Sequence, residues 1–144
     1  LGDFTYEEVA GNIFNPCEEI SAEEFAAIGF ERDSEVGERR TEEKISCRLV
    51  PNENAGPERL AVFSGPANFE DVAAQSEIYG VEVSDLVPGL YLHGPRTTNS
   101  DFCFASVDTK RGQFSIISGD VESSEPVEER CSRAERIMEK LYRI

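Results

Sequence analysis

His93 is the only histidine in the chain, and its ordinary pKa makes it the side chain best suited to proton transfer near neutral pH. A Ser-His-Asp triad would need a serine and an acid beside it, and the nearest candidates are Ser100 and Asp101. The chain has no Gly-x-Ser-x-Gly turn, because Ser64 lies in Phe-Ser-Gly-Pro without the first glycine. We therefore interpret His93 as a residue of a loop or a strand end, and we predict no catalytic residue and no enzyme.

Acidic side chains are abundant, with 29 Asp and Glu residues in 144. Glycosidase chemistry needs two carboxylates whose surroundings push their pKa values apart. The pairs at 18–19, 23–24 and 42–43 lie in polar segments, which favours a solvated surface. A secreted hydrolase with an unrecognised carboxylate site is the alternative to a non-enzymatic function. No calcium-loop spacing occurs, so no metal site is predicted, and whether the acidic stretches bind calcium stays open.

The composition and the missing motifs exclude several classes of partner. A net charge of −15 repels phosphate backbones, so we expect no nucleic-acid binding. The chain has neither a Gly-x-Gly-x-x-Gly motif nor a Walker loop, and we predict no cofactor. No apolar run approaches the roughly 18 residues of a membrane span, which leaves a lipid anchor as the only membrane attachment.

Four cysteines, at positions 17, 47, 103 and 131, indicate a disulfide framework. No Cys-x-x-Cys pair is present, so zinc ligation and thioredoxin-type chemistry lack their usual spacing. Three connectivities are open to four cysteines. Spacing favours Cys17–Cys47 and Cys103–Cys131, because each pair would link neighbouring elements. Paired cysteines would place the protein in an oxidising compartment.

The apolar periodicity predicts helices segregated around a mainly antiparallel sheet, which is an α+β sandwich. Ser21 and Glu24 form a capping box before one helix, and Asn68 can cap another. Residues 31–43 are charged and aperiodic, which indicates a loop. We expect helices after Ser21, over 69–76 and over 127–141, and strands at 45–50, 60–63, 81–83, 90–92, 102–107 and 114–117.

Residues 15–30, Asn-Pro-Cys-Glu-Glu-Ile-Ser-Ala-Glu-Glu-Phe-Ala-Ala-Ile-Gly-Phe, resemble the opening of a family of actinobacterial secreted lipoproteins of unknown function. This family is catalogued as domain of unknown function three-five-five-eight. Ser46-Cys47-Arg48, Cys103 and the Cys131-to-Ala134 segment fit its later positions. The resemblance implies an extracytoplasmic protein, secreted or lipid-anchored at the cell surface, although no anchor cysteine precedes Cys17. The element order also loosely resembles PsbP/Mog1-like lipoproteins.

The function favoured by these observations is a non-enzymatic binding or accessory module of the cell envelope. Its partner would be an envelope protein, a glycan or a small apolar ligand. We expect an N-terminal arm at 1–14 and a single α+β domain at 15–144. Functional residues concentrate on loops, so we place the candidate ligand site around the loop that follows His93. Its candidate residues are Tyr91, His93, Arg96, Thr97, Thr98 and Asn99.

Overall fold

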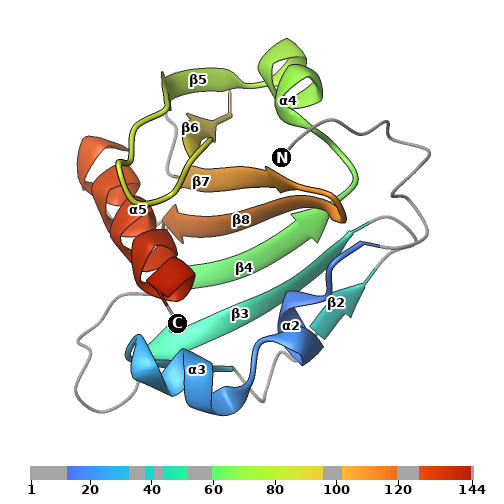
Figure 1. Cartoon of the computed structure of the whole chain (residues 1–144), viewed down its shortest axis with the longest axis vertical. Helices are drawn as coiled ribbons and strands as arrows, with labels where there is room; N and C mark the ends of the chain where they lie inside the picture. Colours follow the sequence, from blue (N-terminus) through green and yellow to red (C-terminus); the bar gives the residue numbers. More distant parts are fainter. Residues whose placement is uncertain are drawn as a thin grey trace.

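A computed structural model describes residues 13–32, 38–40, 44–51, 60–95, 102–119 and 127–143 (Figure 1). Within these ranges, eight strands form one sheet, every strand pair in it is antiparallel, and four helices accompany it. The predicted α+β class is confirmed.

The strands follow the order β1-β3-β4-β8-β7-β6-β5 across the sheet, and β2 also pairs with β3. The helices are α2 (Pro16–Glu19), α3 (Ala22–Ala27), α4 (Phe69–Gln75) and α5 (Val127–Arg143). The strands are β1 (Phe30–Arg32), β2 (Glu38–Arg40), β3 (Ile45–Pro51), β4 (Leu60–Gly65), β5 (Glu77–Val81), β6 (Tyr91–Gly94), β7 (Phe102–Thr109) and β8 (Gly112–Gly119).

Short polar side chains start three of the helices. The Ser21 hydroxyl accepts from the Glu24 amide, and the Glu24 carboxylate accepts from the Ser21 amide, which completes the predicted capping box of α3. Asn68 caps α4 in the same reciprocal way with Asp71. Asn15 caps α2 by accepting from the Cys17 amide. The signals at Ser21 and Asn68 explain why the starts of α3 and α4 could be predicted, whereas the short helix α2 is not among the expected helices.

One face of the sheet carries the core. Cys47, Val62, Ile116 and Ala105 lie side by side across β3, β4, β8 and β7, and none is more than 4% exposed. Side chains of α2, α3 and α5 complete this cluster. Because side chains alternate along a strand, Tyr91, His93 and Ser106 point to the other face.

Two disulfides attach helices to the core face. Cys17–Cys47 joins α2 to β3, with the Cα atoms 5.8 Å apart, and Cys103–Cys131 joins α5 to β7, with 5.1 Å between them. Both predicted pairings are confirmed. The described residues contain no unpaired cysteine.

Two predicted segments differ from the structure. The loop expected at 31–43 is wrong where β1 and β2 pair with opposite ends of β3. Residues 31–32 and 38–40 are all charged, so the sequence shows no apolar period there, although Phe30 at the start of β1 is buried in the core. The strand expected at 81–83 is also misplaced, because β5 begins at Glu77 and contains Gly80. A register shift between Ile78 and Gly80 interrupts the alternation there.

Candidate functional site

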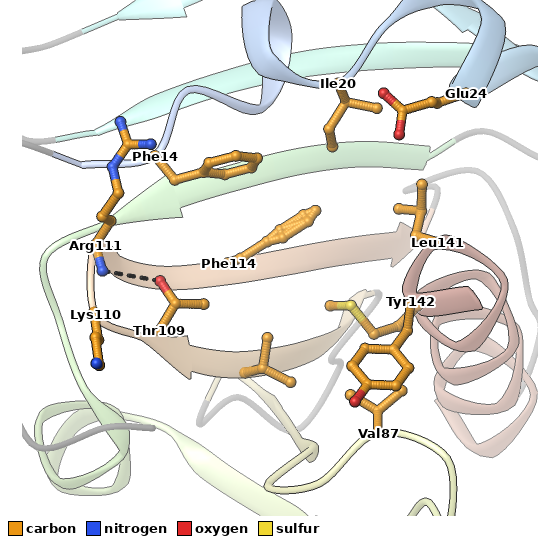
Figure 2. Close-up of a pocket in the computed structure, with 12 residues that line it drawn as sticks. Phe14, Ile20, Glu24, Val87, Thr109, Lys110, Arg111, Phe114, Leu141 and Tyr142 are labelled. Carbon is orange, nitrogen blue, oxygen red and sulfur yellow. Dashed lines mark hydrogen bonds between the residues drawn. The ribbon is translucent and has the colours of Figure 1, made fainter. Parts of the chain in front are cut away.

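A cavity of about 490 Å³ opens on the core side of the sheet, between the α2–α3 segment, the end of α5 and the β7–β8 hairpin (Figure 2). We call this cavity the groove. Most of its lining is apolar, whereas Glu24, Lys110 and Arg111 bring charges to it. Six of its apolar side chains are Phe14, Ile20, Val107, Phe114, Met138 and Leu141.

The segment before α2 forms one wall of the groove. The Phe14 amide donates to the Arg111 carbonyl at 3.1 Å, so the segment is tied to the tip of the hairpin. The Phe14 ring meets the Phe114 ring edge-on, with centroids 5.6 Å apart. Edge-to-face pairs of this kind are favourable beyond the apolar area that they bury. The aromatic wall is therefore held by backbone and ring contacts together.

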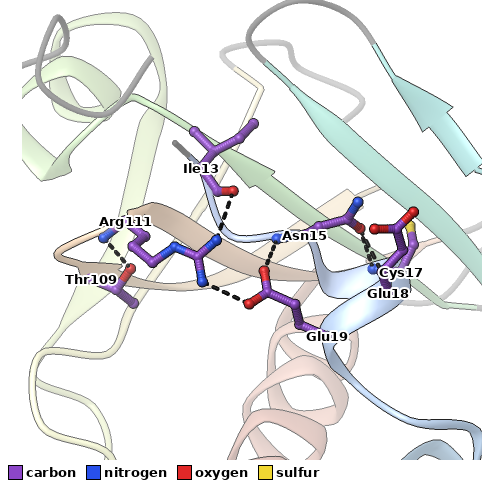
Figure 3. A network of polar contacts seen from close by, with 7 residues as sticks. All are labelled: Ile13, Asn15, Cys17, Glu18, Glu19, Thr109 and Arg111. Atoms are coloured by element: carbon purple, nitrogen blue, oxygen red, sulfur yellow. Dashed lines mark hydrogen bonds and ion pairs between the residues drawn. The ribbon is translucent and has the colours of Figure 1, made fainter. Parts of the chain in front are cut away.

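Arg111 joins this wall to α2 by a polar network (Figure 3). Its guanidinium lies 2.7 Å from Glu19 Oε1 and donates to the Ile13 carbonyl at 3.4 Å. The bond from Arg111, together with one from the Asn15 amide, lowers the pKa of the Glu19 carboxyl. Both side chains of the ion pair are about 40% exposed, at 42% and 38%, so its contribution to stability is small. The network positions the wall more than it stabilises the fold.

The hairpin tip that carries Lys110 has a defined shape. Thr109 Oγ1 donates to the Gly112 carbonyl at 2.7 Å and accepts from the Arg111 amide at 3.1 Å. Gly112 has a φ of +106°, and a Cβ atom there would collide with the Gly65 carbonyl oxygen of β4. Glycine is therefore required at this position, as the predicted hairpin implied.

His93 lies inside β6, on the sheet face opposite the groove, and is 5% exposed. Its ring stacks between those of Tyr91 and Phe104. Its Nε2 lies 2.7 Å from Ser106 Oγ, which lies 2.6 Å from Ser115 Oγ, and both serines are fully buried. Burial lowers the pKa of His93 to about 4, so the ring is neutral at physiological pH. The hydrogen-bonded row of His93, Ser106 and Ser115 is buried, so neither serine hydroxyl is exposed to solvent as a nucleophile.

Tyr91 also lies on the opposite face, beside a second cavity of about 370 Å³. Its hydroxyl donates to Asp108 Oδ1 at 2.9 Å and accepts from Gln113 Nε2 at 3.1 Å. Burial and the nearby Asp108 charge raise the pKa of Tyr91 above its ordinary value. Burial also raises the pKa of Asp108, although its Oδ2 accepts from the Phe69 amide at 2.8 Å. Glu82, whose φ is +49°, lines the same cavity.

The structure brings Tyr91 and His93 together as stacked neighbours, but both are buried in β6. Arg96, Thr97, Thr98 and Asn99 lie outside the described residues. Sequence reasoning did not identify the groove or Asp108. One signal was available for the groove: the apolar stripe of α5 continues through Met138 and Leu141, past the disulfide at Cys131 that already anchors the helix.

Among the described residues, no three His, Cys, Asp or Glu side chains gather closely enough to hold a metal ion. None of the described helices has the length and apolar character to cross a membrane. The two disulfides indicate an oxidising environment.

A protein-family model described as "Protein of unknown function (DUF3558)" matches residues 5–143. No curated protein and no solved structure matches the chain.

Proposed function

The chain belongs to the DUF3558 family of proteins of unknown function, and from this premise we propose that it is a non-enzymatic, extracytoplasmic binding module whose groove takes a small apolar ligand. The observation that carries the proposal is the groove itself. Its volume lies in the usual range for small-molecule sites, which are mainly apolar with a few polar groups.

The apolar lining favours a ligand over an empty, hydrated groove. Leu141 and Val107 are only partly buried, and Tyr142 is 59% exposed. Covering such surface with an apolar ligand yields roughly 25 cal/mol per Å² removed from water. The charged residues Glu24, Lys110 and Arg111 lie at the two ends of the groove (Figure 2). They would therefore orient a ligand while its apolar part contacts the apolar side chains between them.

The location is part of the same proposal. Two disulfides favour an extracytoplasmic protein, and the resemblance to actinobacterial secreted lipoproteins favours one held at the cell surface by a lipid. The intact mass of the protein recovered from its host envelope tests this. A mass excess equal to lipid chains is expected, and an unmodified chain free in the medium would exclude the anchor.

Leu141→Glu is expected to weaken binding of the neutral apolar dye N-phenyl-1-naphthylamine by at least about tenfold, because the carboxylate would lose hydration in the apolar groove. Fluorescence titration of the dye measures this effect. Leu86→Glu is the matched control, since Leu86 is 40% exposed and does not line the groove. A circular-dichroism melt of each variant checks that it is folded.

Val107→Trp provides a second route to the same result, because an indole would fill the groove without adding a charge. Dye binding should again fall while the Leu86→Glu protein binds as the wild type does. If the wild-type protein does not bind the dye, or if both groove variants bind it with unchanged affinity, the proposed function is wrong.

The second cavity is the specific reason to keep a hydrolase as the alternative. Asp108, whose pKa burial raises, and Glu82 both line it, and a carboxyl with a raised pKa suits a general acid. A screen of glycoside, ester and peptide substrates tests this alternative. Turnover that Asp108→Asn abolishes would establish it in place of the non-enzymatic function.

A further inference from the structure

The two ends of the groove differ in charge (Figure 2). Lys110 and Arg111 lie at one end, on the tip of the β7–β8 hairpin, whereas Glu24, Leu141 and Tyr142 lie at the other. The Glu24 carboxylate accepts from the Ser21 amide in the cap of α3, so it already has a structural partner. An elongated ligand in the groove therefore meets different chemistry at its two ends.

The cationic end carries an unneutralised charge. Arg111 is paired with Glu19, at 2.7 Å. The Lys110 ammonium, by contrast, forms no ion pair with any residue that the structure describes. Two consecutive bases at the mouth of an apolar groove stand out in a chain whose net charge is −15. The negative net charge repels anions from the molecule as a whole. Attraction of an anion to the groove therefore depends on the local positive charge of Lys110.

Taking the proposed function as its basis, we propose that the ligand is a single-chain fatty carboxylate, with its alkyl chain along the groove and its carboxylate at Lys110. The cavity of about 490 Å³ is in the size range of small-molecule sites, which gives room for an alkyl chain of medium length such as that of decanoate. Lysine suits the head group because its ammonium is a compact charge on a flexible stem that can follow ligands of different length.

Displacement of the neutral dye by decanoate and by 1-decanol separates the head group from the chain. Near neutral pH and low ionic strength, decanoate is expected to bind about three- to tenfold more tightly than 1-decanol, as a partly exposed charge-assisted contact allows. In about 1 M salt the preference should shrink, since the Debye length falls to about 3 Å. The affinity for 1-decanol should not fall with the added salt.

Lys110→Ala is expected to remove the preference for decanoate, measured as the ratio of the affinities of the same variant for decanoate and for 1-decanol. Lys140→Ala is the matched control, because Lys140 is an exposed lysine of α5 that does not line the groove, and it should keep the preference. Equal binding of decanoate and 1-decanol by the wild type, or a preference that survives Lys110→Ala, overturns this inference and leaves the apolar-ligand function standing. Failure of the protein to bind dye, decanoate and 1-decanol would overturn both.

Discussion

Replacing Cys103 and Cys131 together by alanine is expected to lower the free energy of unfolding by about 3–4 kcal/mol. The two cysteines are 28 residues apart. A cross-link that closes a loop of this length lowers the conformational entropy of the unfolded chain, which stabilises the folded state by about this free energy. The Cys17–Cys47 pair, 30 residues apart, should have a similar effect. Denaturant unfolding of each double variant, followed by circular dichroism, measures the change.

Removing both disulfides should cost roughly 7 kcal/mol, which is comparable to the whole stability of many domains. The variant without cysteines is therefore expected to be largely unfolded at physiological temperature. Reduced wild-type protein provides the control, because it loses the same bonds without any substitution. If the reduced protein kept the denaturation midpoint of the oxidised form, the disulfides would not be the element that stabilises this fold.

The free energy of unfolding is expected to fall by up to about 3 kcal/mol as the pH drops from about 6.5 to about 4. His93 has a pKa of about 4 in the folded protein, against an ordinary value of 6.5. Between these values the unfolded chain binds the proton and the folded chain does not, so acid favours unfolding. Above about pH 6.5 the contribution is fully present, and below about pH 4 its loss is complete.

His93→Phe isolates this effect. Phenylalanine preserves the stacking between Tyr91 and Phe104 and cannot titrate, although the Ser106 hydroxyl loses a partner. The raised pKa of Asp108 acts in the opposite direction, because its folded form takes up a proton more readily as the pH falls. Because Asp108 is present in both proteins, its contribution cancels when the free energy of unfolding of the variant is subtracted from that of the wild type. A difference that does not change between pH 6.5 and 4 would contradict the buried, neutral state of His93.

Much of this fold could be predicted because its signals are local. Ser21 and Asn68 mark helix starts through side chains within three residues, and Gly112 marks a hairpin whose strands alternate on both sides. The disulfide pairing followed from elements that are neighbours in the chain. The strands β1 and β2 could not be predicted, because β1 has only one apolar residue, Phe30, and β2 has none, so neither shows the apolar alternation of a strand.

The groove could not be predicted, since its walls come from distant parts of the chain. Val107 and Leu141 fit the pattern of ordinary core residues, and Phe14 falls in the expected N-terminal arm. Only the fold shows that they border one cavity. The predicted ligand site followed the rule that function concentrates on loops. The two residues of that predicted site that the structure describes, Tyr91 and His93, are instead buried in β6. Their side chains form hydrogen bonds with Asp108 and Ser106, respectively.

The methyl resonance of Met138 gives the most direct test of the proposal that the groove binds an apolar chain. Met138 is the only methionine of the chain, lines the groove and is 4% exposed, so selective ¹³C-methyl labelling yields a single reporter at the site. Titration with decanoate is expected to shift this resonance and to produce nuclear Overhauser contacts between the methyl group and the ligand's methylene protons. Binding of decanoate that leaves the Met138 resonance unchanged would contradict the proposal.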